Sequence, residues 1–191
     1  MKAPDDLFEK ILARKALFKG NYLDLERLRL ELPDGRTADR EIVLVRDAVA
    51  VLPVDKGGVV HLVRQHRAAI GRTLLEVPAG LIEDGETPQQ AAVRECEEEI
   101  GRSPGCLVPL LKYAHAEGYS TGMISLFVGY ELALSDQRSL DESEHLVRVS
   151  LDFDELLEKV RCNEIIDSKT ILSVLIWENM GRSGPRSAGP R

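Results

Sequence analysis

Residues 79–102 read AGLIEDGETPQQAAVRECEEEIGR, and this stretch predicts a loop that leads into a helix. Thr87 is a good N-cap, Pro88 suits the first helical position, and Gln90 completes a capping box with Thr87. Gly101 favours the left-handed conformation with which many helices end. We therefore expect the helix to lie between Thr87 and Gly101, with its small and apolar residues facing a core.

Three carboxylates share one face of this predicted helix, because Glu95, Glu98 and Glu99 are spaced at i, i+3 and i+4. Like charges at this spacing destabilise a helix by about 0.2–0.5 kcal/mol per pair, and Arg94 offsets only part of the excess. Hard divalent cations would neutralise the rest, since Mg²⁺ typically binds one or two carboxylates together with substrate phosphates. The alternatives are a solvated, glutamate-rich helix face and an acidic helix that contacts another protein.

The spacing of these residues resembles the Nudix box, in the form Gly-x5-Glu-x7-Arg-Glu-Cys-x-Glu-Glu-x-Gly. Seven fixed identities at roughly 7% usage each would arise by chance about once in a hundred million starting points, so the signal is specific. The seven are Gly80, Glu86, Arg94, Glu95, Glu98, Glu99 and Gly101. Cys96 stands where the family usually has an aliphatic residue but still packs as a small hydrophobe, and Arg102 replaces the closing aliphatic residue.

Segments on both sides of the box extend the resemblance to the ADP-ribose pyrophosphatase branch of the family. They keep the family's order and approximate spacing over most of the chain. The segments are REIV at 40–43, AVAV at 48–51, VRQHR at 63–67, LEVPAG at 75–80, LDESE at 140–144 and IDSKT at 166–170. The resemblance implies an α/β (α+β) sandwich of the Nudix type, with a mixed β-sheet between helices.

The resemblance also implies a set of metal ligands. Glu95 and Glu99 match the principal metal-binding glutamates, and Glu98 lies beside them as a ligand or a general base. The carbonyl of Ala79 matches a backbone ligand, and Glu144 matches an occasional one. Mg²⁺ is the implied cofactor, and Mn²⁺ can substitute for it.

Other residues match roles in catalysis and substrate binding. Arg94 would orient the carboxylates by ion pairing and Glu86 would brace the loop, while Glu142 in the acidic loop is the better match to a general base. Arg67 resembles the arginine that contacts the substrate diphosphate, and Arg40 resembles one that reaches the diphosphate from a partner subunit. A guanidinium fork suits phosphate oxygens, although both arginines also fit an ordinary surface position.

Two further residues are candidates for the substrate end of the site. Glu76 matches a contact to the substrate or to the residues around it, and Gly118 matches the glycine of a Ser-Pro-Gly segment in this branch. Here residues 116–118 read Ala-Glu-Gly, so Glu117 occupies the proline position. This departure weakens the argument for ADP-ribose itself more than the argument for diphosphate hydrolysis. Tyr119 would stack on a base or close the loop.

Composition limits the classes of protein that fit. The chain has 191 residues, 43% hydrophobic and 30% charged, which is typical of a globular protein. A net charge of −7 argues against nonspecific binding to nucleic acid or to an anionic membrane. The three cysteines form no CxxC pair and the first ten residues have no apolar signal core, so we expect a reducing, cytoplasmic location.

Local patterns predict the order of elements. Residues 7–18 fit a strand or a short helix, and the turn signal at 33–35 joins strands at 22–32 and 40–45 into an N-terminal β-hairpin layer. A hairpin turn at 55–58 is expected to join the next two strands. The later strands are expected at 48–53, 59–65, 74–77, 107–116 and 123–132, and helices at 152–160 and 168–180, with Asp152 and either Asp167 or Ser168 as caps.

Three regions follow from this order. Residues 1–45 form the N-terminal extension, residues 46–180 form the Nudix domain, and residues 181–191 form a Gly/Pro/Ser-rich tail that we expect to be disordered. The hairpin extension and the match at Arg40 predict a homodimer.

These observations predict Mg²⁺-dependent hydrolysis of a nucleoside diphosphate derivative, ADP-ribose or an ADP-sugar, to AMP and a sugar phosphate. GDP-mannose, another nucleotide sugar or a dinucleotide is the alternative substrate. A noncatalytic nucleotide-binding sensor is the alternative class of protein, although a pure binder has no need of the acidic cluster.

Overall fold

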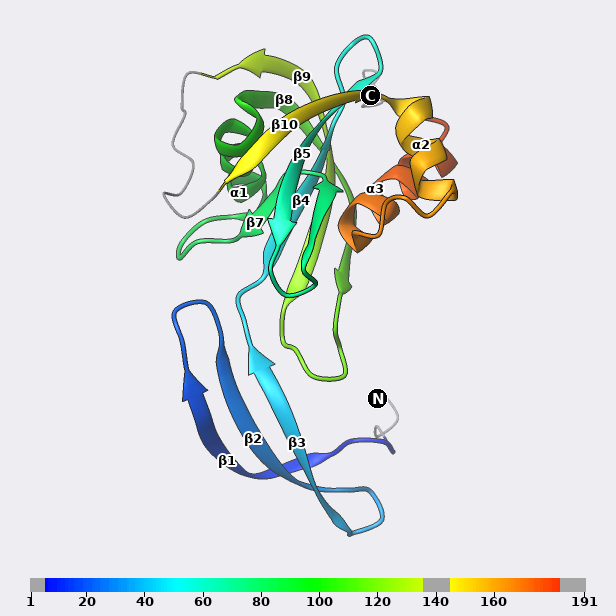
Figure 1. The fold of residues 1–191 in the computed structure, drawn as a ribbon. Coiled ribbons are helices and arrows are strands. Elements are labelled where there is room, and N and C mark those ends of the chain that lie inside the picture. Colours follow the sequence, from blue (N-terminus) through cyan, green and yellow to red (C-terminus); the bar gives the residue numbers. More distant parts are fainter. Residues whose placement is uncertain (1–5, 136–144, 183–191) are drawn as a thin grey trace, which may run out of the picture. The chain divides into compact units, whose positions relative to one another are not determined.

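The computed structural model describes residues 6–135 and 145–182 (Figure 1). The chain forms two compact units. The smaller includes residues 6–47 and 114–123, and the larger includes residues 48–113, 124–135 and 145–182. No helix within these described ranges is long and apolar enough to cross a membrane. The three-part division expected from the sequence stays a prediction.

The smaller unit is built on an antiparallel sheet with the order β1-β2-β3. Its strands are β1 (Lys10–Lys19), β2 (Asp24–Glu31) and β3 (Thr37–Leu44). The predicted hairpin is formed by β2 and β3, and Gly35 between them has a φ of 83°, which favours glycine. Residues 7–18, for which strand and helix were both open, contribute β1, so the hairpin is extended to three strands.

The larger unit contains seven strands and four helical segments within the described ranges. The strands are β4 (Ala48–Pro53), β5 (Val59–Arg67), β6 (Arg72–Glu76), β7 (Ala79–Leu81), β8 (Arg102–Ala114), β9 (Met123–Leu134) and β10 (Leu146–Asp152). The helical segments are α1 (Pro88–Glu95), the π-helix η1 (Cys96–Ile100), α2 (Phe153–Arg161) and α3 (Ser168–Asn179).

Two sheets organise these strands. One has the order β7-β4-β9-β8 and is mixed, because β4 runs parallel to β9 and antiparallel to β7. The other is antiparallel and has the order β10-β5-β6. The predicted hairpin pairing of β4 with β5 was therefore wrong. The turn at 55–58 is present, with Gly58 N–H donating to the carbonyl of Asp55, but the two strands separate into different sheets beyond the bridge between Val54 and Val60.

The central strands are covered by helices on both faces (Figure 1). Successive side chains of β4 alternate between two cores: Val49 and Val51 pack with residues of α1 and η1, whereas Ala50 and Leu52 pack with residues of α2 and α3. This period of two explains why β4 is apolar throughout, since each of its faces is buried. The predicted mixed sheet between helices is confirmed.

The C-terminal helices begin where the sequence indicated. Asp152 caps α2 by accepting a hydrogen bond from the N–H of Asp154, and Asp167, rather than Ser168, caps α3 by accepting one from the N–H of Thr170. Two strands were not predicted. β7 occupies the first three residues of the stretch that was expected to be a loop, and β10 pairs along its whole length with β5 and leads directly into α2.

Candidate active site

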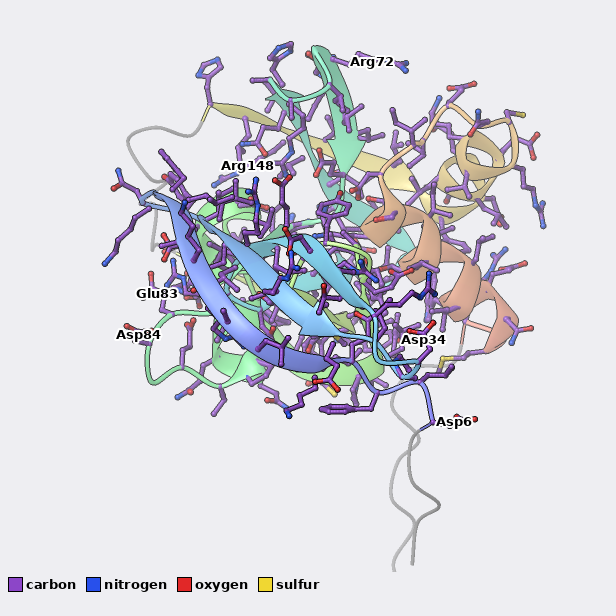
Figure 2. The ribbon with its side chains drawn as sticks, turned by 90° about the horizontal axis from the view of Figure 1, so that it is seen from below. Asp6, Asp34, Arg72, Glu83, Asp84 and Arg148 are labelled. Carbon is purple, nitrogen blue, oxygen red and sulfur yellow. The ribbon has the colours of Figure 1, made fainter. Side chains whose placement is uncertain are left out.

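The helix that follows β7 has the predicted capping residues at both ends. Thr87 N–H donates to Oε1 of Gln90 at 2.9 Å, and Gln90 N–H donates to Oγ1 of Thr87 at 3.3 Å, which together make the capping box. Gly101 ends the helix with a φ of 66°. Glu83 and Asp84, which Figure 2 labels, lie on the loop between β7 and α1. From Cys96 onward the helix widens into the π-helix η1, a feature common at functional sites and without a signal in this sequence.

The Arg94 side chain contacts three carboxylates, one on the loop before the helix and two on the helix itself. Its Nε and Nη2 donate to the two oxygens of Glu86 at 3.0 Å each, and Nη1 donates to Glu95 at 2.7 Å and to Glu98 at 3.1 Å. Nη2 also donates to the carbonyl of Leu81 at 2.9 Å. Arg94 therefore links the end of β7 and the following loop to α1 and η1. These contacts correspond to the ion pairing expected of Arg94 and the bracing of the loop expected of Glu86.

These contacts shift the protonation equilibria of the partners. The hydrogen bonds with Glu86 raise the pKa of Arg94 well above its usual value, against the opposing effect of burial and with a further contribution from Glu95. The same bonds lower the pKa of Glu86, and the N–H of Glu83 contributes in the same direction. The arginine is a permanent cation and Glu86 is ionised at neutral pH.

The two predicted principal ligands are buried beside the segment Ala79-Gly80. Glu95 is 7% exposed and Glu99 is 2% exposed, and Oε2 of Glu99 accepts a hydrogen bond from the N–H of Ala79 at 3.1 Å. A Cβ on Gly80 would overlap the carboxylate of Glu95. Glycine at position 80 therefore lets the Glu95 carboxylate lie against the backbone, and a side chain there would displace this carboxylate.

We call Arg94 together with Glu86, Glu95, Glu98 and Glu99 the Arg94 cluster. One guanidinium and four carboxylates leave it with a formal charge of −3. Its oxygen donors are those that Mg²⁺ and similar hard cations prefer, so the donor chemistry fits such an ion. Within residues 6–135 and 145–182, however, no three His, Cys, Asp or Glu side chains already converge as a formed metal centre. Arg94 and the N–H of Ala79 hold these oxygens instead.

A second cluster forms where β5, β6 and the start of α3 meet. Arg67 donates to both oxygens of Glu76, from Nε and Nη2 at 2.8 Å each, and Glu76 is only 1% exposed. This bidentate pair raises the pKa of Arg67, chiefly through the hydrogen bonds with Glu76 and against the effect of burial. Glu99 also contributes to this increase, so the two clusters interact electrostatically.

Lys169 and Asp167 complete this second cluster; Asp167 was predicted only as a helix cap, and Lys169 had no predicted role. Lys169 Nζ lies 2.5 Å from Oδ1 of Asp167 and 3.3 Å from Oε2 of Glu76. Burial lowers the pKa of Lys169, but the carboxylates of Asp167 and Glu76 together raise it by more, so the net shift is upward. Both residues belong to the segment IDSKT at 166–170, whose match to the family was the available signal. We call Arg67, Glu76, Asp167 and Lys169 the Arg67 cluster.

The remaining predicted residues lie in the smaller unit or outside the described residues. Arg40 is on β3, where its Nη2 donates to Glu9 at 2.8 Å, and Gly118 is in the turn that follows β8. Glu142 and Glu144 fall in the segment 136–144, outside the described residues. The structure therefore brings Arg94, Glu95, Glu98, Glu99 and Ala79 together, with Arg67 and Glu76 in the neighbouring cluster.

Comparisons with known proteins identify the family. Residues 44–170 match the family model described as NUDIX domain. The chain is 36% identical over 169 residues to an ADP-ribose pyrophosphatase of Bacillus subtilis (strain 168), which covers 88% of this chain and 91% of the relative. It is 34% identical to a protein of Bacillus methanolicus named methanol dehydrogenase activator, covering 87% of this chain and 90% of that one.

A third relative is an ADP-ribose pyrophosphatase of Mycobacterium tuberculosis (strain ATCC 25618 / H37Rv), 30% identical over 88% of this chain and 82% of its own length. Among solved structures, one described as "Crystal structure of ADP compounds hydrolase" superposes with a TM-score of 0.81 at 22% identity. It covers 92% of this chain and 97% of that chain. At this identity the structural likeness shows the fold.

Proposed function

This chain belongs to the Nudix family and is a Nudix hydrolase, and we propose that it cleaves the diphosphate bond of ADP-ribose or an ADP-sugar, releasing AMP and a sugar phosphate. The Arg94 cluster carries this proposal. Arg94 contacts three of the four carboxylates, two of the four are buried, and the cluster has a formal charge of −3 beside the box loop. Such a charge is stable when cations and a substrate diphosphate complete it.

Nudix hydrolases generally use divalent metal ions. Glu95, Glu98, Glu99 and the carbonyl of Ala79 are the residues that would hold Mg²⁺, or Mn²⁺ in its place, with Glu144 as a further ligand. When bound, the ion would neutralise diphosphate charge and lower the pKa of a water molecule.

The chain's own residues would do the remaining work. Arg94 keeps the carboxylates of Glu95 and Glu98 in place, and a carboxylate, Glu142 or Glu98, accepts the proton of the attacking water. Water attacks one phosphorus, the bond between that phosphorus and the bridging oxygen breaks, and the second phosphate leaves with the bridging oxygen.

Arg67 is the residue proposed to bind the diphosphate, and its bond to Glu76 supports this role by fixing the guanidinium plane. Glu76 thereby acts as a positioning residue, and Gly118 is proposed at the sugar or base end of the substrate. Arg40 is proposed to reach the diphosphate from a partner subunit. This requires a homodimer, which light scattering tests: a particle of 21.2 kDa under assay conditions would refute the proposed dimer. We also propose a cytoplasmic location, because all three cysteines are free thiols.

The experiment that tests the activity is product analysis. Purified protein is incubated with Mg²⁺ or Mn²⁺ and with ADP-ribose, ADP-glucose, GDP-mannose and a diadenosine polyphosphate, in ¹⁸O-water. We expect AMP and ribose 5-phosphate from ADP-ribose, with ¹⁸O in one product, which also identifies the phosphorus attacked. A protein that cleaves none of the four refutes the proposal.

Glu117 is the reason to test substrates other than ADP-ribose, since it replaces the usual proline of the Ser-Pro-Gly segment. Faster cleavage of GDP-mannose or of the dinucleotide would assign the enzyme to that substrate. Tight binding of ADP-ribose without turnover would instead indicate a nucleotide sensor. A melting temperature that does not respond to Mg²⁺ or Mn²⁺ would favour an acidic protein-interaction helix.

A further inference from the structure

The helix formed by α1 and η1 ends with backbone carbonyls that accept no hydrogen bond from within the helix. In any helix the last four carbonyls have no intrahelical partner. Here Gly101 turns the chain away with a φ of 66°, and its N–H reaches the carbonyls of Cys96 and Glu97. The carbonyls of Glu98 and Glu99, the next two along the chain, need donors from another element.

A single side chain serves both of these carbonyls. Arg148, labelled in Figure 2, lies on β10. It donates from Nε to the carbonyl of Glu99 at 2.8 Å and from Nη2 to the carbonyl of Glu98 at 3.1 Å. A cation at the C-terminal end of a helix is also stabilised by the helix dipole. The guanidinium therefore meets the requirement of the helix end in both hydrogen bonding and charge.

The surroundings of Arg148 fit this contact. Arg148 is paired with Val63 in the antiparallel ladder of β10 with β5, which fixes the point from which the side chain extends. A Cβ on Gly101 would lie 2.8 Å from Nη1 of Arg148, so the glycine that ends the helix also leaves room for the guanidinium. The carbonyl of Gly101 in turn accepts a hydrogen bond from Ser135 N–H at 3.0 Å.

The two hydrogen bonds have a geometric consequence for Glu99. Peptide units are rigid planes, and the carbonyls of Glu98 and Glu99 belong to the two planes that flank the Glu99 Cα. Fixing both planes fixes both backbone dihedral angles of Glu99. It therefore fixes the direction in which this glutamate extends towards Ala79.

We propose that Arg148 is a positioning residue of the active site, which holds the backbone of Glu98 and Glu99 so that their carboxylates are placed for the divalent cation. The inference rests on the proposed function, in which these glutamates are ligands. Partners that orient metal ligands in this way typically change metal affinity or activity by about 10–100-fold when removed.

The test compares the wild-type protein with R148A, R148K and R161A. Arg161 lies exposed at the end of α2 and is the matched control for loss of an arginine. Three quantities are measured for each protein: the Mn²⁺ dissociation constant by titration, kcat and KM for ADP-ribose, and hydrogen exchange of the backbone N–H groups of Ile100 and Gly101 in metal-free protein.

We expect R148A to weaken Mn²⁺ binding and to lower kcat by about tenfold each, with KM for ADP-ribose changed by less than about twofold. Exchange at the helix end should become faster in the same variant without metal. R148K keeps the charge but not the two-pronged donor, so it should fall between R148A and the wild type. R161A should match the wild type. If R148A does not fold, R148K carries the same comparison.

Equal Mn²⁺ affinity and kcat in R148A and the wild type, with only a lower melting temperature in the variant, would overturn the inference and leave Arg148 as a structural cap. A wild-type protein that neither binds Mn²⁺ nor cleaves the substrates is a separate result, which refutes the proposed function itself. The exchange measurement on metal-free protein tests the backbone contact in either case.

Discussion

The larger unit contains two arginine-centred clusters that differ in their balance of charge. The Arg94 cluster has one cation against four carboxylates, whereas the Arg67 cluster has two cations against two carboxylates. Both include nearly buried acids. The Arg67 cluster therefore has a formal charge of zero, whereas the Arg94 cluster has a formal charge of −3. Residual charge, rather than burial or the number of ion pairs, therefore marks the cluster that is suited to bind cations.

The strongest test of this contrast reduces the formal charge of the Arg94 cluster from −3 to −1. E95Q/E99Q takes two negative charges from the Arg94 cluster, and we expect kcat with Mg²⁺ to fall at least about a thousandfold, roughly 4 kcal/mol of transition-state stabilisation. E97Q, on the same π-helix, is the matched control and should retain activity. Unchanged turnover and Mn²⁺ affinity in the double variant would remove the basis of the proposed function.

The corresponding change in the Arg67 cluster should affect stability instead. K169M leaves Glu76 and Asp167 with a single neighbouring guanidinium, and because Lys169 and Glu76 are largely buried we expect a loss of about 3 kcal/mol in the free energy of unfolding. Urea denaturation measures this loss. K159M breaks surface ion pairs with Glu155 and Glu164, which solvent screens, and should leave stability close to that of the wild type. Equal effects of the two variants would contradict the assignment.

Replacement of Gly80 by alanine tests the Arg94 cluster without changing its charge. G80A would force the Glu95 carboxylate away from the backbone, and displacement of a catalytic group by about 1 Å typically reduces the rate by about 100-fold. The expected result is a lower kcat in a protein that still unfolds cooperatively. G57A lies on the turn between β4 and β5, where the new Cβ would be 3.3 Å from Oδ1 of Asp55, and its kcat should stay within about twofold of the wild type. Wild-type kcat in G80A would contradict the close packing of Glu95.

Local features of the sequence predicted local structure well. The capping residues Thr87 and Gln90 and the terminal Gly101 are read within a single helix, and each has the expected conformation. Non-local pairing was the source of error. The turn at 55–58 is a correct local signal, yet β4 pairs in parallel with β9, more than 70 residues away, because both of its faces are apolar.

The missed features have two explanations. Residues 147–152 of β10 read VRVSLD and alternate apolar and polar side chains, so the strand was overlooked although its pattern is present, whereas its pairing with β5 cannot be read from its own sequence. Lys169 acquires its role only when α3 brings it to Glu76, 93 positions earlier in the chain. The box motif indicated the Arg94 cluster, but the pairing of Lys169 with Glu76 in the Arg67 cluster can be identified only from the structure.

The smallest effect concerns how Arg94 is held in its own cluster, and it depends on pH. The pKa of Glu86 is lowered in the folded protein, first by its hydrogen bonds with Arg94. Its contribution to stability is therefore complete above the ordinary glutamate pKa of about 4.3, and it is lost as pH falls through the folded-state value. At pH 7 we expect E86Q to lower the free energy of unfolding by about 1 kcal/mol, measured by urea denaturation. The difference between wild type and E86Q should shrink below pH 4, and a constant difference from pH 7 to pH 3 would show that the Arg94–Glu86 ion pair does not contribute.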